Sequence, residues 1–327
     1  MNRYDIHDPH DFFEYVRLED SAPEARRDRI DVALLDMNHW WPNVGHNALV
    51  HVILEAAEPL REELLRRGLK VRVLSFDVRR RNHLPASPNG RFQIYVGTGG
   101  PGHLDPRHNN GVHEWSQGVE ETAEWEAPLF RLFDDILAND TAAMIAVCHS
   151  FGLVCRWSGI ARTVLRPEKS TGMPLNRLSH EAMRHPWFEQ FARSLPDHKH
   201  FRVVDNRLFD LILEDAGKSL PIAFEAEGST ALTMVEVARD PNGTMPRFLG
   251  VNHHPEIVDR DHIMQVLDEK RAHGEVSDQW YDERATTMRD LFRGESERQS
   301  RLTSQYTLIE PLRFHLERVV RDRTSMT

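Results

Sequence analysis

Short apolar runs that alternate with helical patterns constrain the fold of this chain more than any other feature. The runs have the length and β-branched content of buried strands, and they lie at residues 30–35, 71–76, 92–96 and 144–147. Helical periodicity covers Ala48 to Gly68 and Glu126 to Leu137. Such alternation is typical of an α/β protein, in which a mostly parallel sheet lies between layers of helices. Reactive groups in this architecture gather at the carboxyl ends of the strands.

Cys148 stands where one of these runs ends and a helical pattern begins. The segment Ala146-Val147-Cys148-His149-Ser150 therefore predicts a thiol on a strand-to-helix turn. A thiol with the ordinary pKa of about 8.5 is mostly protonated at neutral pH, and it becomes a nucleophile when an imidazole or a helix N-terminus stabilises the thiolate. Cys148 is a candidate nucleophile, although taken alone it also fits a buried structural cysteine. The turn favours the thiol over the hydroxyl of Ser150.

The segment His253-His254-Pro255-Glu256 offers a base together with a carboxylate that can orient it. Residues two apart in an extended segment point the same way, so Glu256 can hold the imidazole of His254 toward a thiol. Pro255 biases His254 away from the helical region. His253 should face the opposite side, so the base is assigned to His254. Two predicted strands, 232–237 and 247–251, are joined by a turn and should deliver His254 to the site.

A glycine-rich turn, Gly97-Thr98-Gly99-Gly100-Pro101-Gly102, follows the predicted strand 92–96. Glycines allow the backbone to approach a ligand closely and leave amide N–H groups available. We expect the amides of Gly100 and His149 to stabilise a developing oxyanion. Three further residues near this edge are candidates for substrate binding: Gly99, Ser150 and Trp41.

Taken together and in this order, the Gly-Gly-Pro turn, the strand-Cys-helix turn and the terminal His-Pro-Glu resemble the class I glutamine amidotransferase superfamily, over roughly Arg29 to Ile257. The resemblance implies a flavodoxin-like three-layer α/β sandwich with a catalytic triad of Cys148, His254 and Glu256. It also implies a thioester intermediate, in which Cys148 attacks a carbonyl and His254 protonates the leaving group. No cofactor is expected.

The chain departs from this family where the substrate is chosen. Amidotransferases usually carry glycine two residues after the cysteine and glutamine four residues after it, and these positions are Ser150 and Gly152 here. Ala146 stands two residues before the cysteine, where glycine is usual. The motifs therefore support the hydrolytic machinery better than they support glutamine as its substrate. The Cys148-His149 pair also resembles, secondarily, the turn of a related group in which that histidine takes part.

Three functions are compatible with these motifs. The leading one is release of ammonia from glutamine or a related small carboxamide. It requires a separate synthase subunit that accepts the ammonia, because the chain has no phosphate-binding loop motif of its own. The second is a stand-alone cysteine hydrolase or acyltransferase, as in the γ-glutamyl hydrolases and homoserine acyltransferases. The third is a non-catalytic relative that uses Cys148 for a redox response or ligand binding.

Charge and cysteine content narrow the partners and the compartment. The formal net charge of −10 disfavours nucleic acid as the main partner, and the run Arg79-Arg80-Arg81 is predicted to be a solvated loop. Cys148 and Cys155 are too far apart on a helix to form a disulfide, so Cys155 is expected to be a small buried hydrophobe. The chain shows no signal-peptide pattern and no membrane-spanning run, and we expect a cytoplasmic protein. The histidine pairs lack zinc-binding spacing, so no metal is expected.

The pattern divides the chain into three parts. Residues 1–28 are polar and are predicted to form a loose arm or short helix, and residues 29–257 carry the motifs of the predicted catalytic domain. Within that domain, 153–161 should continue the helix after Cys148, and the polar stretch 170–196 is expected to be a lid. Residues 258–327 should form a docked helical extension, with a homo-oligomer contact as one role open to it. Its predicted helices lie at 263–272, 278–292 and 308–320.

Overall fold

The computed structural model describes residues 6, 10–88, 90–217, 219–225, 230–258, 260–292 and 294–323. Its strands are β1 Phe13–Arg17, β2 Arg29–Asp36, β3 Lys70–Asp77, β4 Phe92–Gly97, β5 Ala143–Val147, β6 Ala161–Gly172, β7 Leu175–Leu178, β8 His200–Arg202, β9 Asp205–Leu213, β10 Leu220–Glu225, β11 Leu232–Arg239 and β12 Pro246–Val251. Its helices are α1 Val44–Ala57, α2 Arg61–Arg66, α3 Val78–Arg81, α4 Glu126–Ala138, α5 His149–Ser158, α6 Phe188–Ser194, α7 Arg260–Ala272, α8 Asp278–Leu291, α9 Glu295–Ser304 and α10 Glu310–Asp322. Shorter helical turns are Glu58–Leu60, Pro106–His108, Glu114–Ser116, Ala182–Arg184 and the π-type segment Gln305–Ile309.

The described residues form one ten-stranded sheet, in the order β1-β3-β2-β4-β5-β12-β11-β10-β7-β8, and a two-stranded sheet of β6 and β9. The strands from β1 to β12 in this order run parallel, and the remaining four continue the large sheet in antiparallel pairs. All residues of β5 and β12 are buried, as expected for strands covered on both faces. The mostly parallel α/β sheet predicted from the alternation is confirmed.

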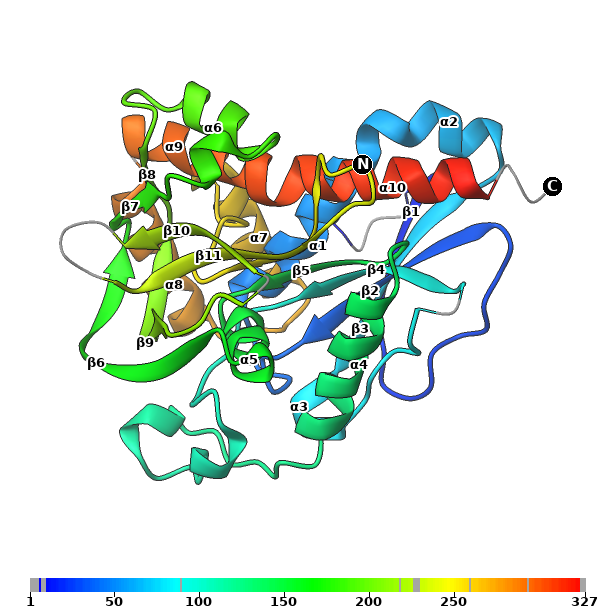
Figure 1. Cartoon of the computed structure of the whole chain (residues 1–327). Helices are drawn as coiled ribbons and strands as arrows, with labels where there is room; N and C mark the ends of the chain where they lie inside the picture. The colour runs from blue at the N-terminus through cyan, green and yellow to red at the C-terminus, as the bar shows by residue number, and fades with distance from the viewer. Residues whose placement is uncertain are drawn as a thin grey trace.

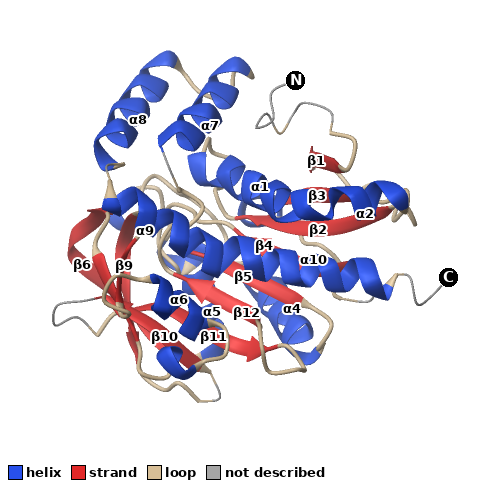
Figure 2. Cartoon of the chain, turned by 90° about the horizontal axis from the view of Figure 1, so that it is seen from above, coloured by secondary structure: helices blue, strands red, loops and turns tan. Residues whose placement is uncertain are grey.

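Helices cover both faces of the sheet, which gives three layers (Figures 1 and 2). On one face α1, α6, α9 and α10 lie over the strands, and on the other face lie α4 and α5. The second face is rich in aromatic side chains, where Phe133 of α4 and Phe151 of α5 are fully buried with Phe248 of β12. The amphipathic helices thus bury their apolar sides against the strands.

Part of the segment that was expected to be an arm is a strand of the sheet. β1 pairs in parallel with β3, from Phe13 beside Val71 to Arg17 beside Ser75. Phe12 and Phe13 are almost completely buried, so they anchor this edge strand in the core. The charged residues around them conceal the strand in the sequence, and the pairing with β3 decides its structure.

The expectation that residues 170–196 form a lid was wrong. This stretch contains the end of β6, the strand β7 and the helix α6, and β7 pairs with both β8 and β10. Helix α5 also ends earlier than predicted, at Ser158, because Gly159 takes a left-handed φ of 72° and Ala161 starts β6. Leu178, Phe188 and Phe191 of this stretch are buried in the core.

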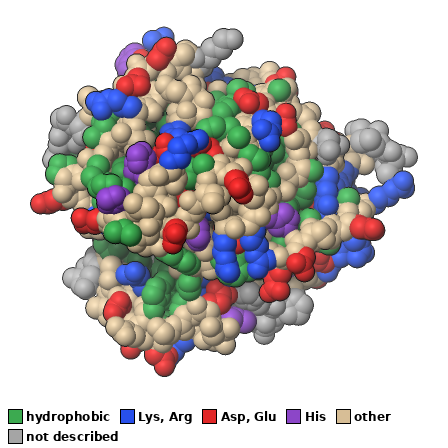
Figure 3. Space-filling model, turned by 90° about the horizontal axis from the view of Figure 1, so that it is seen from below, with side chains coloured by type: hydrophobic (Ala, Val, Ile, Leu, Met, Phe, Trp, Pro, Cys, Tyr) green, Lys and Arg blue, Asp and Glu red, His purple; other side chains and the backbone are tan. Residues whose placement is uncertain are grey.

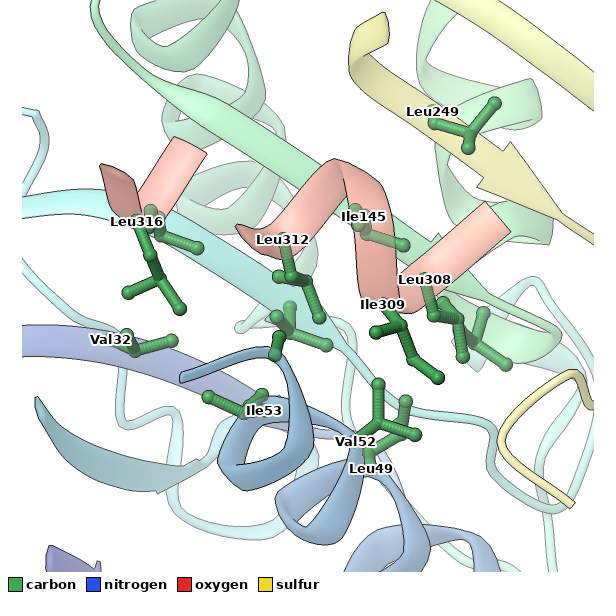
Figure 4. Close-up of a cluster of buried hydrophobic side chains, with 14 of the residues drawn as sticks. Val32, Leu49, Val52, Ile53, Ile145, Leu249, Leu308, Ile309, Leu312 and Leu316 are labelled. Atoms are coloured by element: carbon green, nitrogen blue, oxygen red, sulfur yellow. The ribbon is translucent and has the colours of Figure 1, made fainter. Parts of the chain in front are cut away.

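The helices of the C-terminal region are present, and the last of them belongs to the main core. Leu312 and Leu316 of α10 are buried against Ile53 of α1 and against Val32 and Ile145 of the sheet (Figure 4). Figure 1 shows α10 running across the sheet beside α1. The apolar face of α10 is therefore occupied within the molecule, which explains why the C-terminal region packs as part of the same body.

Replacing Leu312 by Ala should lower the free energy of unfolding by about 2–5 kcal/mol, because the substitution removes buried apolar surface and leaves a cavity. Glu317, partly exposed on the same helix, provides the matched control, and Glu317→Ala should change the same quantity by less than about 0.5 kcal/mol. Urea unfolding followed by tryptophan fluorescence measures both. Equal effects of the two substitutions would contradict the packing of α10.

The surface below the sheet carries both signs of charge. Figure 3 shows Lys and Arg side chains interspersed with Asp and Glu over this face, with histidines among them. None of the helices within the described residues is long and apolar enough to cross a membrane.

Candidate active site

The register of the central strands brings three of the predicted motifs to one edge of the sheet. Val147 of β5 pairs with Val251 of β12, so Cys148 and Asn252 begin side by side. On the other flank of β5, Gly97 of β4 pairs with Ala146, which places the glycine-rich turn beside Cys148. The hairpin of β11 and β12 forms as predicted and carries the segment of His254 to this edge. These are the carboxyl ends of parallel strands, where sites form in α/β proteins.

Cys148 lies on a strained turn between β5 and α5. Its backbone has φ 50° and ψ −102°, a region that non-glycine residues rarely adopt, and its amide donates to the carbonyl of Val251 at 2.7 Å. The thiol is partly exposed at the N-terminus of α5. A strained strand-to-helix turn of this kind presents a nucleophile above a sheet.

The strain at Cys148 predicts an unusual stability effect. Replacing Cys148 by Gly should give a protein more stable than the Cys148→Ala variant by about 1 kcal/mol. Glycine relieves about 1–3 kcal/mol of strain in the folded state, and the larger conformational entropy of glycine in the unfolded state offsets part of this gain. The difference between the two midpoints of urea unfolding measures it. If the alanine variant proved equally stable or more stable, the turn would not be strained.

His254 and Glu256 make the hydrogen-bonded pair that the sequence predicted. Nδ1 of His254 lies 2.7 Å from Oε1 of Glu256, and the Glu256 side chain is fully buried. Burial lowers the pKa of His254, but the charges of Glu256 and of the Cys148 thiolate, with hydrogen bonds to both, raise that pKa well above its ordinary value. The arrangement favours an imidazolium beside a thiolate, with the carboxylate holding the ring.

The carboxylate is also enclosed by the start of α1. A Cβ added to Gly45 would lie 2.8 Å from Oε1 of Glu256, so the first turn of this helix sits directly against the acid. Asn43 caps the helix by accepting from the amide of Gly45 at 2.7 Å. The positive end of the helix dipole thus faces the buried Glu256 side chain.

His253 faces away from the pair, as predicted. Its ring is almost completely buried and packs edge-on against Phe201 of β8, with ring centroids 5.8 Å apart. Burial, together with the charges of Arg207 and His254, lowers the pKa of His253 to about 3. His253 is therefore neutral at physiological pH and is packed in the core.

The glycine-rich turn closes the site opposite the histidine. A Cβ on Gly99 would lie 2.9 Å from Cε1 of His254 and 3.5 Å from Cβ of Cys148, and a Cβ on Gly100 would collide with the carbonyl oxygen of Met37. Both positions therefore require glycine. Within the described residues, the amides of Gly100 and His149 have no protein acceptor, so they are available as donors.

Comparison with known proteins identifies the fold. No protein-family model and no curated protein matches the sequence. Among solved structures, a glutamine amidotransferase from Thermotoga maritima matches with 13% sequence identity and a TM-score of 0.50, over 88% of this chain and 98% of that chain. The fold is that of the glutamine amidotransferases. A glutamine amidotransferase from Methylobacillus flagellatus is also similar, with 13% identity and a TM-score of 0.45, over 90% of this chain and 91% of that chain.

The candidate substrate-binding residues occupy different places in this amidotransferase fold. Gly99 flanks Cys148 and His254. Ser150 is fully buried, and its hydroxyl donates to the carbonyl of Thr98 at 2.7 Å, which ties α5 to the glycine-rich turn. Trp41 is 40% exposed and approaches Gly118, which lies in the segment between the glycine-rich turn and α4. Within the described residues, neither Ser150 nor Trp41 makes a hydrogen bond to the Cys148 thiol.

The sequence prediction missed one buried cation near the site. Arg79, expected in a solvated loop, has a side chain that is fully buried and paired with Glu121. The expectation was wrong because its partners lie far along the chain. The position of Arg79 in the sequence could have indicated its place near the site, because it follows the end of β3, at the edge of the sheet where Cys148 also lies.

Other features of the described residues do not add to the site. No group of three or more His, Cys, Asp or Glu residues within them is placed to hold a metal ion. An open hollow of about 410 Å³ lies between the loop after α3 and helix α4, and none of its lining residues belongs to the predicted triad. Cys155 is fully buried, and burial raises its pKa, so it behaves as the small hydrophobe predicted.

Proposed function

We propose that this protein is a cysteine-dependent amide hydrolase that releases ammonia from glutamine or a related small carboxamide. The observation that carries the proposal is the position of His254, which is hydrogen-bonded to a buried carboxylate and lies beside a thiol on a strained turn. A structural cysteine and a loop histidine would have no reason to share this arrangement. The amidotransferase fold is consistent with it.

The proposed reaction follows from the positions of these groups. The Cys148 thiolate attacks the amide carbonyl, and the developing oxyanion faces the amides of Gly100 and His149. The His254 imidazolium then donates its proton to the leaving nitrogen, which departs as ammonia and leaves a thioester on Cys148. Neutral His254 next takes a proton from water, the hydroxide attacks the thioester, and the carboxylic acid leaves while the thiolate and imidazolium are restored. Glu256 holds the ring throughout.

A second candidate function has an observation in its favour. Gly152, which stands where amidotransferases usually carry glutamine, packs against Leu104, because a Cβ there would lie 2.5 Å from both methyl carbons of that side chain. The space beside this position is therefore taken by an apolar residue from another segment. This favours a stand-alone hydrolase or acyltransferase that uses the same triad on a different acyl substrate.

The proposed amidotransferase activity calls for a partner. We propose that a separate synthase protein binds this chain and uses the ammonia released at Cys148. A contact between copies of this chain through the C-terminal helices also stays a prediction, and the apolar face of α10 is not available for it.

Intact-mass spectrometry after incubation with the glutamine mimic 6-diazo-5-oxo-norleucine tests the proposal, together with an ammonia-release assay on glutamine. We expect one adduct and ammonia production from the wild type, and neither from Cys148→Ala. If the wild type gives no adduct and no ammonia while Cys148 still reacts rapidly with iodoacetamide, glutamine is excluded and the second candidate is favoured. A Cys148 that also reacts slowly with iodoacetamide would exclude both enzyme functions.

A further inference from the structure

Arg79 occupies an unusual position for a cation, because its side chain is fully buried just below the glycine-rich turn. Its Nη1 donates to the carbonyl of Met37 at 2.9 Å and to the carbonyl of Pro101 at 2.6 Å. Its Nε and Nη2 donate to the two carboxylate oxygens of Glu121 at 3.0 and 2.6 Å. The guanidinium therefore joins three segments at once.

The two carbonyls that Arg79 binds define the path of the predicted oxyanion turn. Met37 follows β2, and its carbonyl is the group against which Gly100 packs, since a Cβ on Gly100 would collide with it. Pro101 is the residue directly after Gly100. One guanidinium nitrogen thus binds both the carbonyl of Met37, against which Gly100 packs, and the carbonyl of Pro101, the residue after Gly100. A displacement of either carbonyl would move the amide of Gly100.

The helix side of the oxyanion site also lies close to this cation. Burial first, and then the charge of Arg79, lower the pKa of the His149 imidazole well below its ordinary value. The carbonyl of Gly100 contributes a smaller effect in the opposite direction. His149 supplies the second predicted oxyanion amide, so the charge of Arg79 also acts on the residue at the start of α5.

Glu121 is itself held firmly. Its Oε1 accepts from Nδ2 of Asn109 at 2.6 Å, and its Oε2 accepts from Nε1 of Trp125 at 3.1 Å. Asn109 in turn accepts from the amide of His103 at 2.7 Å. Residues 103–125, which lie between the glycine-rich turn and α4 at the bottom of Figure 1, therefore hold in place the carboxylate that binds the guanidinium. The planar, bidentate pair fixes the orientation of the guanidinium as well as its charge.

We propose that Arg79 is the positioning residue of the oxyanion hole, and that Glu121 orients it for this role. The proposal rests on the proposed function, because it assigns Arg79 a role in that reaction. Arg79 does not touch the substrate. It holds the Gly100 amide where the oxyanion develops, and a misplacement of about 1 Å at such a donor costs roughly a hundredfold in rate.

The chain offers a matched control for a merely structural role. Arg72 lies on β3, one strand length before Arg79, and its Nε donates to the buried Asp31 at 2.7 Å. This pair lies at the amino ends of β2 and β3, away from the site. Arg72→Met and Arg79→Met therefore each remove a buried arginine from a buried carboxylate, although Asp31 keeps Arg91 as a second partner, and only the second substitution releases the turn.

Two measurements test the proposal on Arg79→Met, Arg79→Lys and Arg72→Met. The first is hydrogen exchange, read by mass spectrometry on peptides that cover residues 98–102. The second is the steady-state hydrolysis of glutamine, with the rate of Cys148 alkylation by iodoacetamide measured in parallel. We expect Arg79→Met to speed exchange in the turn and to lower kcat by about a hundredfold, with little change in alkylation rate or KM. Arg79→Lys should recover part of kcat, and Arg72→Met should match the wild type in both measurements.

Unchanged exchange in the turn of a folded Arg79→Met protein would overturn the proposal, as would equal effects of Arg72→Met. If Arg79→Met fails to fold, Arg79→Lys decides by the same two criteria. If the wild type does not hydrolyse glutamine, the proposed glutaminase function fails separately. Hydrogen exchange then decides alone whether Arg79 holds the turn.

Discussion

Cys148→Ala, His254→Asn and the double variant should each lose at least about 10⁴-fold in kcat/KM, and the double variant should be no worse than either single variant. The reason is that the thiolate and the imidazolium act as one unit. Without the histidine the thiol lacks a proton acceptor and the leaving group lacks a proton donor, and without the thiol the histidine has nothing to activate. Steady-state kinetics on a substrate that the wild type hydrolyses measures the three values.

Two control variants separate this effect from general damage. Cys155→Ala removes the other thiol, which is fully buried on the same helix, and it should keep most of the activity. His180→Ala removes an exposed histidine and should have no effect. Losses that simply add up in the double variant would mean that Cys148 and His254 act independently, and the proposed pair would be wrong.

Glu256→Gln should lower kcat by about 10²–10⁴-fold at neutral pH and move the alkaline limb of the pH profile to lower pH. The direction follows from the pKa of His254, which Glu256 helps to raise above its ordinary value. With glutamine in place of the carboxylate, the imidazolium loses its proton at a lower pH, and the leaving group then loses its proton donor. A profile of kcat against pH for both proteins measures the shift.

The same pair makes a pH-dependent contribution to stability. Because the pKa of His254 is raised in the folded state, this contribution is fully present below the unfolded pKa of about 6.5 and is lost as the pH rises through the folded pKa. Urea unfolding at several pH values should show this dependence in the wild type and less of it in Glu256→Gln. A pH-independent difference between the two proteins would contradict the raised pKa.

A second buried histidine–carboxylate pair provides the control. Nε2 of His185 lies 2.8 Å from Oε2 of Glu236, and the pair lies under helix α6 at a distance in sequence from Cys148. Glu236→Gln should lower stability without moving the alkaline limb of kcat. If both substitutions moved the limb equally, the shift would not report on His254.

The local patterns of the sequence predicted the features that depend on near neighbours. The alternation of apolar runs and helical periods predicted the α/β sheet, because strand and helix periodicities are set by residues a few positions apart. The apolar run before Cys148 predicted its strand-to-helix turn. The spacing of His254 and Glu256 predicted their hydrogen bond, but the expected extended segment is a turn, in which the amide of Ile257 donates to the carbonyl of His254 at 3.1 Å.

Only the tertiary structure decided the features that depend on distant partners. β1 became a strand because β3 was available beside it, and 170–196 became part of a sheet because β10 offered an edge. Arg79 became a buried cation because Glu121 and the carbonyls of Met37 and Pro101 surround it. A charged side chain is buried only where its partners replace water, and those partners come from segments that the chain brings together on folding. The chemistry proposed for Cys148 can thus be read along the sequence, whereas the support beneath its oxyanion turn exists only in the folded molecule.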